Sequence, residues 1–186
     1  MSTFDYLTVL FSVIMGLALT QILQGLRALM LARSRVIIYW PALIWAVLLI
    51  LVVAQAWWGM FGMRDLREWN FAKYASVVFQ ITAMYLMVGI AVPDVPAEGV
   101  HDMRKAYFAH SRWFFGMLAL TVAATFTKDL ITIGRISSEW NAYFLEFYFT
   151  LSVIAAITRA RWFHWFLAPF SVIVIVVYTA LLSFRL

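Results

Sequence analysis

The chain has no cysteine and few charged residues. Its 186 residues include no Cys, and only 12% are Asp, Glu, Lys or Arg. The lack of cysteine excludes disulfide bonds, thiolate metal sites and thiol nucleophiles. Soluble domains average about 25% charged and about 45–50% apolar residues, whereas 65% of this chain is hydrophobic. A chain of this length cannot bury so much apolar surface in one water-soluble core, so we expect an integral membrane protein.

Enzyme motifs are also missing. The sequence contains no Gly-x-Ser-x-Gly, no His-Glu-x-x-His and no phosphate-binding loop, so we expect neither catalytic residues nor a cofactor. The net charge is +5, but the 14 Lys and Arg residues occur in short clusters between apolar runs. That pattern is typical of loops beside membrane helices. It does not indicate a nucleic-acid-binding surface.

Long apolar runs are what the chain has in abundance. A spanning helix needs about 20 mostly apolar residues, and the sequence predicts six such helices in one transmembrane domain over 1–186. The predicted ranges are 6–27, 37–62, 74–93, 109–133, 140–158 and 162–184. The predicted fold is therefore an all-α six-helix bundle. The first run is too long for a cleaved signal peptide, so we expect it to remain as a helix.

The links between these runs are short. The longest, 93–105, contains helix-breaking prolines and a glycine, and its part from His101 predicts a short interfacial helix. Basic residues on the two sides number eight against six, which favours both termini outside the cytoplasm. The eight are Arg27, Arg33, Arg35, Arg104, Lys105, Arg112, Arg159 and Arg161, and the six are Arg64, Arg67, Lys73, Lys128, Arg135 and Arg185.

Tryptophan and tyrosine pairs flank nearly every apolar run. We interpret them as aromatic belts at the headgroup level, with a ring-stacking pocket as the alternative. A faint internal match also exists, because the triplet Ala-Leu-Thr occurs at 18–20 and again at 119–121. If this match is more than coincidence, the chain is a 3+3 inverted repeat, which is a feature of many transporter folds.

The first apolar run carries a small or polar residue at every fourth position. Positions four apart share one helix face, with a drift of about 40° per step. Small residues permit close helix crossings in lipid, where hydrophobicity does not drive association. We therefore predict a helix-packing ridge, with a polar wall of a pore as the alternative. Its residues are Thr8, Ser12, Gly16 and Thr20, followed by Gln24.

Glu146 is the ionisable residue most out of place for lipid. Its helix has about 19 residues and must use nearly all of them to cross. At about 1.5 Å per residue, Glu146 would lie about 9 Å inside from Trp140. An ionisable residue at that depth is by default a functional-site hypothesis with a named partner. Three interpretations stay open: an ion pair with Lys128, a proton, ion or solute pathway, or a surface position.

The candidate lining of such a pathway consists of the remaining polar residues within the predicted spans. They are Gln21, Gln24, Arg27, Gln55, Gln80, Lys128, Asp129 and Glu146. The three histidines, His101, His110 and His164, all map to the opposite side of the membrane. Two of them on neighbouring helices could hold haem or a metal. Because His110 and His164 sit at helix mouths without a metal-binding spacing, we predict interfacial histidines and no metal site.

The segments FDYLTVLFSVIMGLALTQILQGL, YWPALIW and QAWWGMF resemble a family of small bacterial inner-membrane proteins. The resemblance covers the first two predicted helices and implies a location, with no particular chemistry. Two functional hypotheses lead, with a lipid-modifying enzyme as a distant third. The first is a small-solute or ion channel or transporter with a polar intramembrane cluster. The second is a non-catalytic accessory subunit of a larger complex, or a homo-oligomer, surrounded by membrane lipids.

Overall fold

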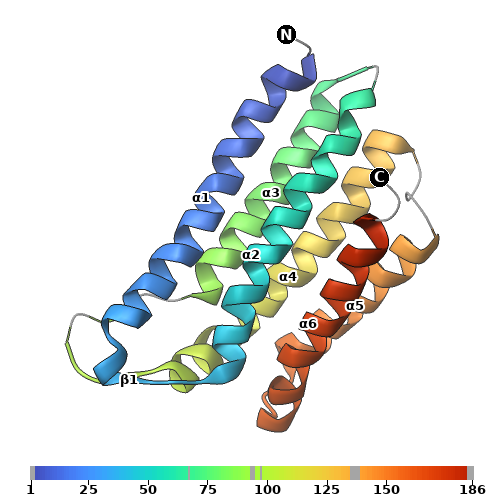
Figure 1. The fold of residues 1–186 in the computed structure, drawn as a ribbon. Coiled ribbons are helices and arrows are strands. Elements are labelled where there is room, and N and C mark those ends of the chain that lie inside the picture. The colour runs from blue at the N-terminus through green and yellow to red at the C-terminus, as the bar shows by residue number, and fades with distance from the viewer. Residues whose placement is uncertain (1–2, 67, 93–94, 97, 135–138, 184–186) are drawn as a thin grey trace.

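The computed structural model is a bundle of six long helices (Figure 1), as the sequence predicts. It describes residues 3–66, 68–92, 95–96, 98–134 and 139–183. All six helices are long and apolar enough to cross a membrane, which makes the chain a polytopic membrane protein. The helices are α1 (Thr3–Leu31), α2 (Trp40–Met60), α3 (Phe71–Ala91), α4 (Met103–Ile133), α5 (Glu139–Ile157) and α6 (Arg161–Ser183).

Local sequence signals set several of the helix ends. Pro41 lies in the first turn of α2, where its missing N–H leaves no helix hydrogen bond unmade. The side chain of Asn70 caps α3 by accepting a hydrogen bond from the Lys73 N–H at 2.9 Å. Gly134 ends α4 in the left-handed conformation at φ 72°, which glycine adopts without steric cost.

The largest differences from the predicted boundaries are in α1 and α4. Helix α1 is longer than the expected 6–27 at both ends. Helix α4 begins at Met103 rather than near 109, so the predicted short interfacial helix is the first part of α4 itself. The reason is Asp102, whose Oδ1 accepts hydrogen bonds from the N–H groups of Arg104 and Lys105 and so caps the helix there.

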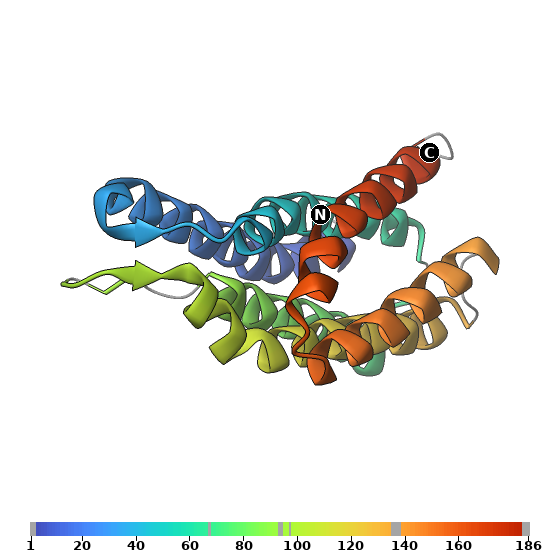
Figure 2. The same ribbon diagram turned by 90° about the horizontal axis from the view of Figure 1, so that it is seen from below.

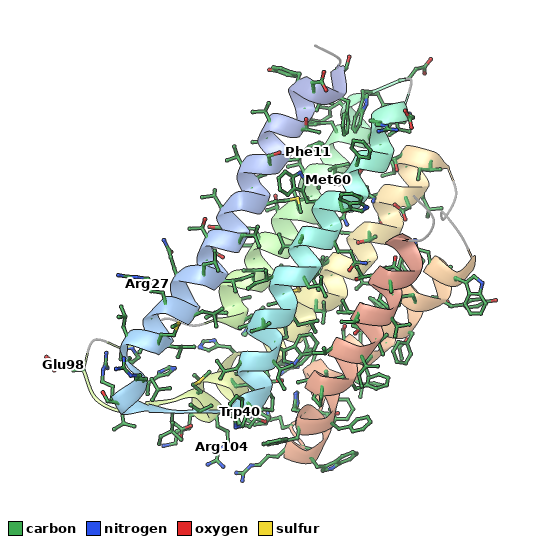
Figure 3. The ribbon with its side chains drawn as sticks, in the orientation of Figure 1. Phe11, Arg27, Trp40, Met60, Glu98 and Arg104 are labelled. Carbon is green, nitrogen blue, oxygen red and sulfur yellow. The ribbon has the colours of Figure 1, made fainter. Side chains whose placement is uncertain are left out.

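The helices form two layers of three, seen most clearly from below (Figure 2). One layer holds α1, α2 and α6 in that order, and the other holds α3, α4 and α5. Helix α1 packs across the layers on α3. Phe11 and Met60 lie in the shared apolar interior near the N-terminal end of the bundle (Figure 3).

A small parallel strand pair ties two of the links together at one end. Strand β1 (Val36–Ile37) pairs with β2 (His101–Asp102). The Arg35 guanidinium adds hydrogen bonds to the carbonyl oxygens of Pro96 at 2.6 Å and Gly99 at 3.2 Å. We call this the strand end of the bundle: β1, β2 and the first turns of α2, α4 and α6. The N-terminal end is the opposite one.

The packing does not follow a 3+3 division. In an inverted repeat, the α1–α3 contact would correspond to a contact between α4 and α6. The backbones of α4 and α6 do not pack closely, and the two helices meet through long side chains such as Phe115 and His164. A two-layer arrangement that separates α6 from α4 and α5 explains this difference.

Tryptophans near the helix ends project outward. Trp40, Trp140 and Trp162 are 57%, 75% and 74% exposed. This is the orientation that an aromatic belt requires, because an indole ring at the headgroup level must reach the lipid interface. Trp45 is the contrast: it is buried between α2 and α4, with its ring edge-on to Phe114 and Phe115.

Candidate functional site

The ridge of α1 faces two ways. Its first half, Thr8 and Ser12, is half-buried, whereas Gly16, Thr20 and Gln24 are exposed. The face of α1 that packs on the bundle is instead apolar: Phe11, Met15, Ala18 and Ile22. We call Gly16, Thr20 and Gln24 the outer ridge of α1. This ridge is not a wall of an interior passage within the described chain, because it lies on the outside of the bundle.

Gln21 and Arg27, two other polar residues of α1, face in different directions. Gln21 turns inward toward α3, where a Cβ on Gly89 would lie 3.0 Å from its Oε1 atom. That oxygen is buried and accepts no hydrogen bond from the described residues. Arg27 is exposed and projects away from α1 into the surroundings (Figure 3). The two do not share a site.

Lys128 and Asp129 form a largely buried ion pair. The Lys128 Nζ lies 2.9 Å from the Asp129 Oδ1, and the side chains are 17% and 7% exposed. Asp129 also lies close to Tyr178 of α6. Glu146 is exposed on α5, so the described structure gives Lys128 an acidic partner on its own helix and leaves Glu146 at the surface.

Gln55 and Gln80, the two glutamines of the predicted pathway outside α1, are half-buried. Gln80 donates a hydrogen bond from its Nε2 to the Thr125 Oγ1 at 2.8 Å, which links α3 to α4. Thr125 in turn donates to the Thr121 carbonyl at 2.9 Å. This chain of hydrogen bonds has the geometry of a helix-packing contact. Gln55 lies on α2, away from this Gln80–Thr125 contact between α3 and α4.

His164, which the sequence predicts at the membrane interface, forms polar contacts inside the bundle. The residue is fully buried, at 0% exposure. Its Nε2 lies 2.8 Å from the Thr158 carbonyl oxygen, and its Nδ1 lies 2.9 Å from the Tyr107 hydroxyl. A carbonyl oxygen only accepts, so in the neutral ring Nε2 carries the proton and Nδ1 accepts from Tyr107.

Aromatic rings enclose this imidazole. Tyr107 and Phe108 pack edge-on to it, with ring centroids at 5.5 and 5.2 Å, and Phe115 lies at 5.4 Å. His164 therefore joins α4, α6 and the link after α5. We call His164, Tyr107, Phe108, Phe115 and the Thr158 carbonyl the lock. The interfacial interpretation fails for His164 because these rings shield it from water, although it stands only three residues into its helix.

The inward face of α6 carries a polar residue at every seventh position: His164, Ser171 and Tyr178. Ser171 is fully buried, and its carbonyl oxygen accepts a hydrogen bond from the Tyr148 hydroxyl at 3.3 Å. Tyr178 donates to the Asn141 Oδ1 and stacks on Phe144 with a ring-centroid distance of 3.7 Å. The heptad spacing is visible in the sequence and could have indicated a buried polar face.

Two small hollows lie among the described residues. One hollow between α2, α4, α5 and α6, lined by Trp45, Tyr148 and Ser171 among others, has no room for water. A second, near His101 and Tyr107, has room for about one water molecule. Neither is a passage through the bundle. The predicted pathway residues therefore fall into separate groups on the inside and the outside.

The three histidines are dispersed as well. His101 is buried on β2, His110 is exposed on α4, and His164 is enclosed on α6. Within the described ranges, no three His, Asp or Glu residues gather in a way that could hold a metal ion. No protein-family model, curated protein or solved structure matches the chain. The resemblance to small bacterial inner-membrane proteins therefore stays a prediction.

Proposed function

We propose that the protein is a non-catalytic structural subunit of an assembly in the bacterial inner membrane. The observation that carries the proposal is the outward direction of Gly16, Thr20 and Gln24 on a helix whose opposite face is already packed. The partner is another transmembrane helix, from a second copy of the chain or from a different subunit.

The chemistry of the outer ridge favours contact with another helix over contact with lipid. A Cβ placed on Gly16 meets nothing within 4 Å, so the backbone is open to close approach. The Thr20 Oγ1 already donates to the Gly16 carbonyl oxygen at 2.8 Å, which leaves its surface methyl group free to pack. The Gln24 amide is costly to leave in hydrocarbon without hydrogen bonds, and polar side chains of this kind bond across helix pairs.

Glu146 supports a second contact on the far side of the molecule. It is exposed on α5, which lies at the edge of the layer that does not contain α1 (Figure 2). An ionisable side chain within a spanning helix normally faces a partner or a water-filled space. Glu146 lines neither of the two hollows described above, which favours a partner chain beside α5. Two separate contact surfaces favour a larger assembly.

Site-specific photocrosslinking in native membranes tests this proposal. A photoreactive residue at Thr20 is compared with one at Ile173, which is an apolar lipid-facing position, 64% exposed, on α6. We expect a discrete protein adduct from Thr20 and none from Ile173. An adduct of twice 21.4 kDa identifies a second copy, and another mass identifies a different subunit. Equal behaviour of the two positions would exclude the outer ridge as a contact.

A small-solute or ion pathway is the second candidate. The observation that favours it is the Lys128–Asp129 pair, buried at membrane depth near the last turns of α6. Intramembrane ionisable groups of this kind mark ion and proton pathways in many transporters. In proteoliposomes, this candidate predicts a proton or ion flux that Asp129→Asn reduces. Flux that equals that of empty liposomes would remove it.

A further inference from the structure

We infer that the strand end of the bundle binds the phosphate headgroup of an anionic lipid between Arg104 of α4 and Arg161 of α6, above the buried hydroxyl of Tyr39. This inference does not depend on the proposed assembly, because it concerns a different surface. We call these three residues the headgroup site.

The placement of the two arginines follows from the lock around His164. Phe108 and His164 pack with ring centroids 5.2 Å apart. Arg104 precedes Phe108 by four residues and Arg161 precedes His164 by three, so each arginine lies one turn outward on the same helix face. Both are exposed, and Arg104 projects out of the strand end (Figure 3).

Tyr39 supplies an independent observation. The residue is only 6% exposed, and its hydroxyl has no hydrogen-bond partner among the described residues. Its ring packs on Tyr107 and Phe108 of α4, at centroid distances of 5.2 and 5.9 Å. Burial raises the pKa of Tyr39, while Arg104 and Arg161 act on it in the opposite direction, which places both guanidinium groups near its oxygen.

These groups suit a phosphate. Two guanidinium groups donate in the fork geometry that phosphate oxygens accept, and a phenolic hydroxyl adds one more donor. Trp40 and Trp162, which are 57% and 74% exposed, stand next to the site at the level where lipid headgroups meet acyl chains. Basic groups between membrane helices at the cytoplasmic surface bind anionic headgroups elsewhere. An anionic phospholipid is thus a better fit than a zwitterionic one.

Binding of defined lipids to the purified full chain in neutral detergent tests the inference, with the bound lipid measured by mass spectrometry of the intact complex. The probes are phosphatidylglycerol, phosphatidylcholine and inorganic phosphate. We expect phosphatidylglycerol to bind at least about fivefold more tightly than phosphatidylcholine. Tighter binding of inorganic phosphate than of phosphatidylglycerol would overturn the lipid as the source while keeping the phosphate chemistry.

Matched variants locate the site. Arg104→Gln and Arg161→Gln should each weaken phosphatidylglycerol binding about fivefold, the effect of one basic residue near an anionic headgroup. Lys105→Gln removes the same charge one residue away and should change binding by less than about twofold, because a surface charge outside the site is screened. Tyr39→Phe should weaken binding without changing thermal unfolding. Equal effects of the Arg104 and Lys105 variants, or no preference for phosphatidylglycerol, would overturn the inference.

Discussion

Helices α1 and α6 stand at the two edges of the same three-helix layer and use their polar residues in opposite ways. On α6 the polar residues recur every seven positions and turn inward, where the side chains of His164 and Tyr178 bond to Tyr107 and Asn141. On α1 they recur every four positions, and the outer ridge turns away from the bundle. The same kind of residue therefore stabilises the fold in one helix and is left available to a partner in the other.

This difference predicts two kinds of mutant. Changes on the inward face of α6 should lower the free energy of unfolding of the single chain. Changes on the outer ridge of α1 should leave that free energy unchanged and affect only association.

His164→Ala should destabilise the chain by about 2–4 kcal/mol, because it leaves the buried Tyr107 hydroxyl unpaired and creates a cavity among aromatic rings. The measurement is unfolding in mixed micelles followed by circular dichroism. His110→Ala is the control, since His110 is exposed on α4 and should change the unfolding free energy by less than about 0.5 kcal/mol. Equal losses in the two variants would contradict the role of the lock.

Gly25→Ala should destabilise the chain by about 1–3 kcal/mol. A Cβ at this position would clash with the Val92 Cγ1, so the Val92 side chain or the two segments would have to shift. Gly16→Ala on the same helix is the matched control, because nothing lies within 4 Å of its Cβ. We expect unchanged thermal unfolding for the Gly16 variant, and a comparable loss there would remove the distinction between inner and outer faces of α1.

Asp129→Ala should cost about 1–3 kcal/mol, because Lys128 is then left unpaired at only 17% exposure. The chain offers an exposed counterpart in Arg64 and Asp65, whose side chains lie 3.6 Å apart and are 51% and 81% exposed. Asp65→Ala should change stability by less than about 0.5 kcal/mol. Chemical denaturation of both variants in the same detergent measures the difference.

The smallest effect concerns the cap of α4. Backbone hydrogen bonds from Lys105 and Arg104 hold the pKa of Asp102 below its usual 3.8. A lowered folded-state pKa means that the cap is fully present above pH 3.8 and is lost as the pH falls through the lowered value. Hydrogen exchange at the Arg104 and Lys105 amides, corrected for intrinsic rates, should therefore rise only below that pH. In Asp102→Ala the exchange should be fast at every pH.

The sequence predicts the fold well because length and hydropathy decide whether a helix can cross a membrane, and both are local properties. It also predicts which residues are small or polar on α1. What it does not predict is the direction in which each polar residue faces. That depends on how the layers pack: Gln21 and Gln24 are three residues apart, yet one meets α3 and the other faces outward.

The direction of a side chain around its helix also decides the exposure of His164 and Glu146. Distance from a helix end suggested an interfacial histidine and left a surface position for Glu146 as one of three interpretations. In the structure His164 is enclosed by aromatic rings, whereas Glu146 is exposed on α5. Depth along a helix is readable from sequence, but the angle around the helix is set by contacts between segments far apart in the chain.

The most direct test of the central claim is the mass of the assembly extracted in native lipid for the wild-type chain and for Gly16→Ile. The account predicts a wild-type particle that contains more than one 21.4 kDa chain or an additional subunit, and a Gly16→Ile particle reduced to a single chain whose thermal unfolding is unchanged. A wild-type particle that holds one chain alone, or an assembly that survives Gly16→Ile intact, would contradict it.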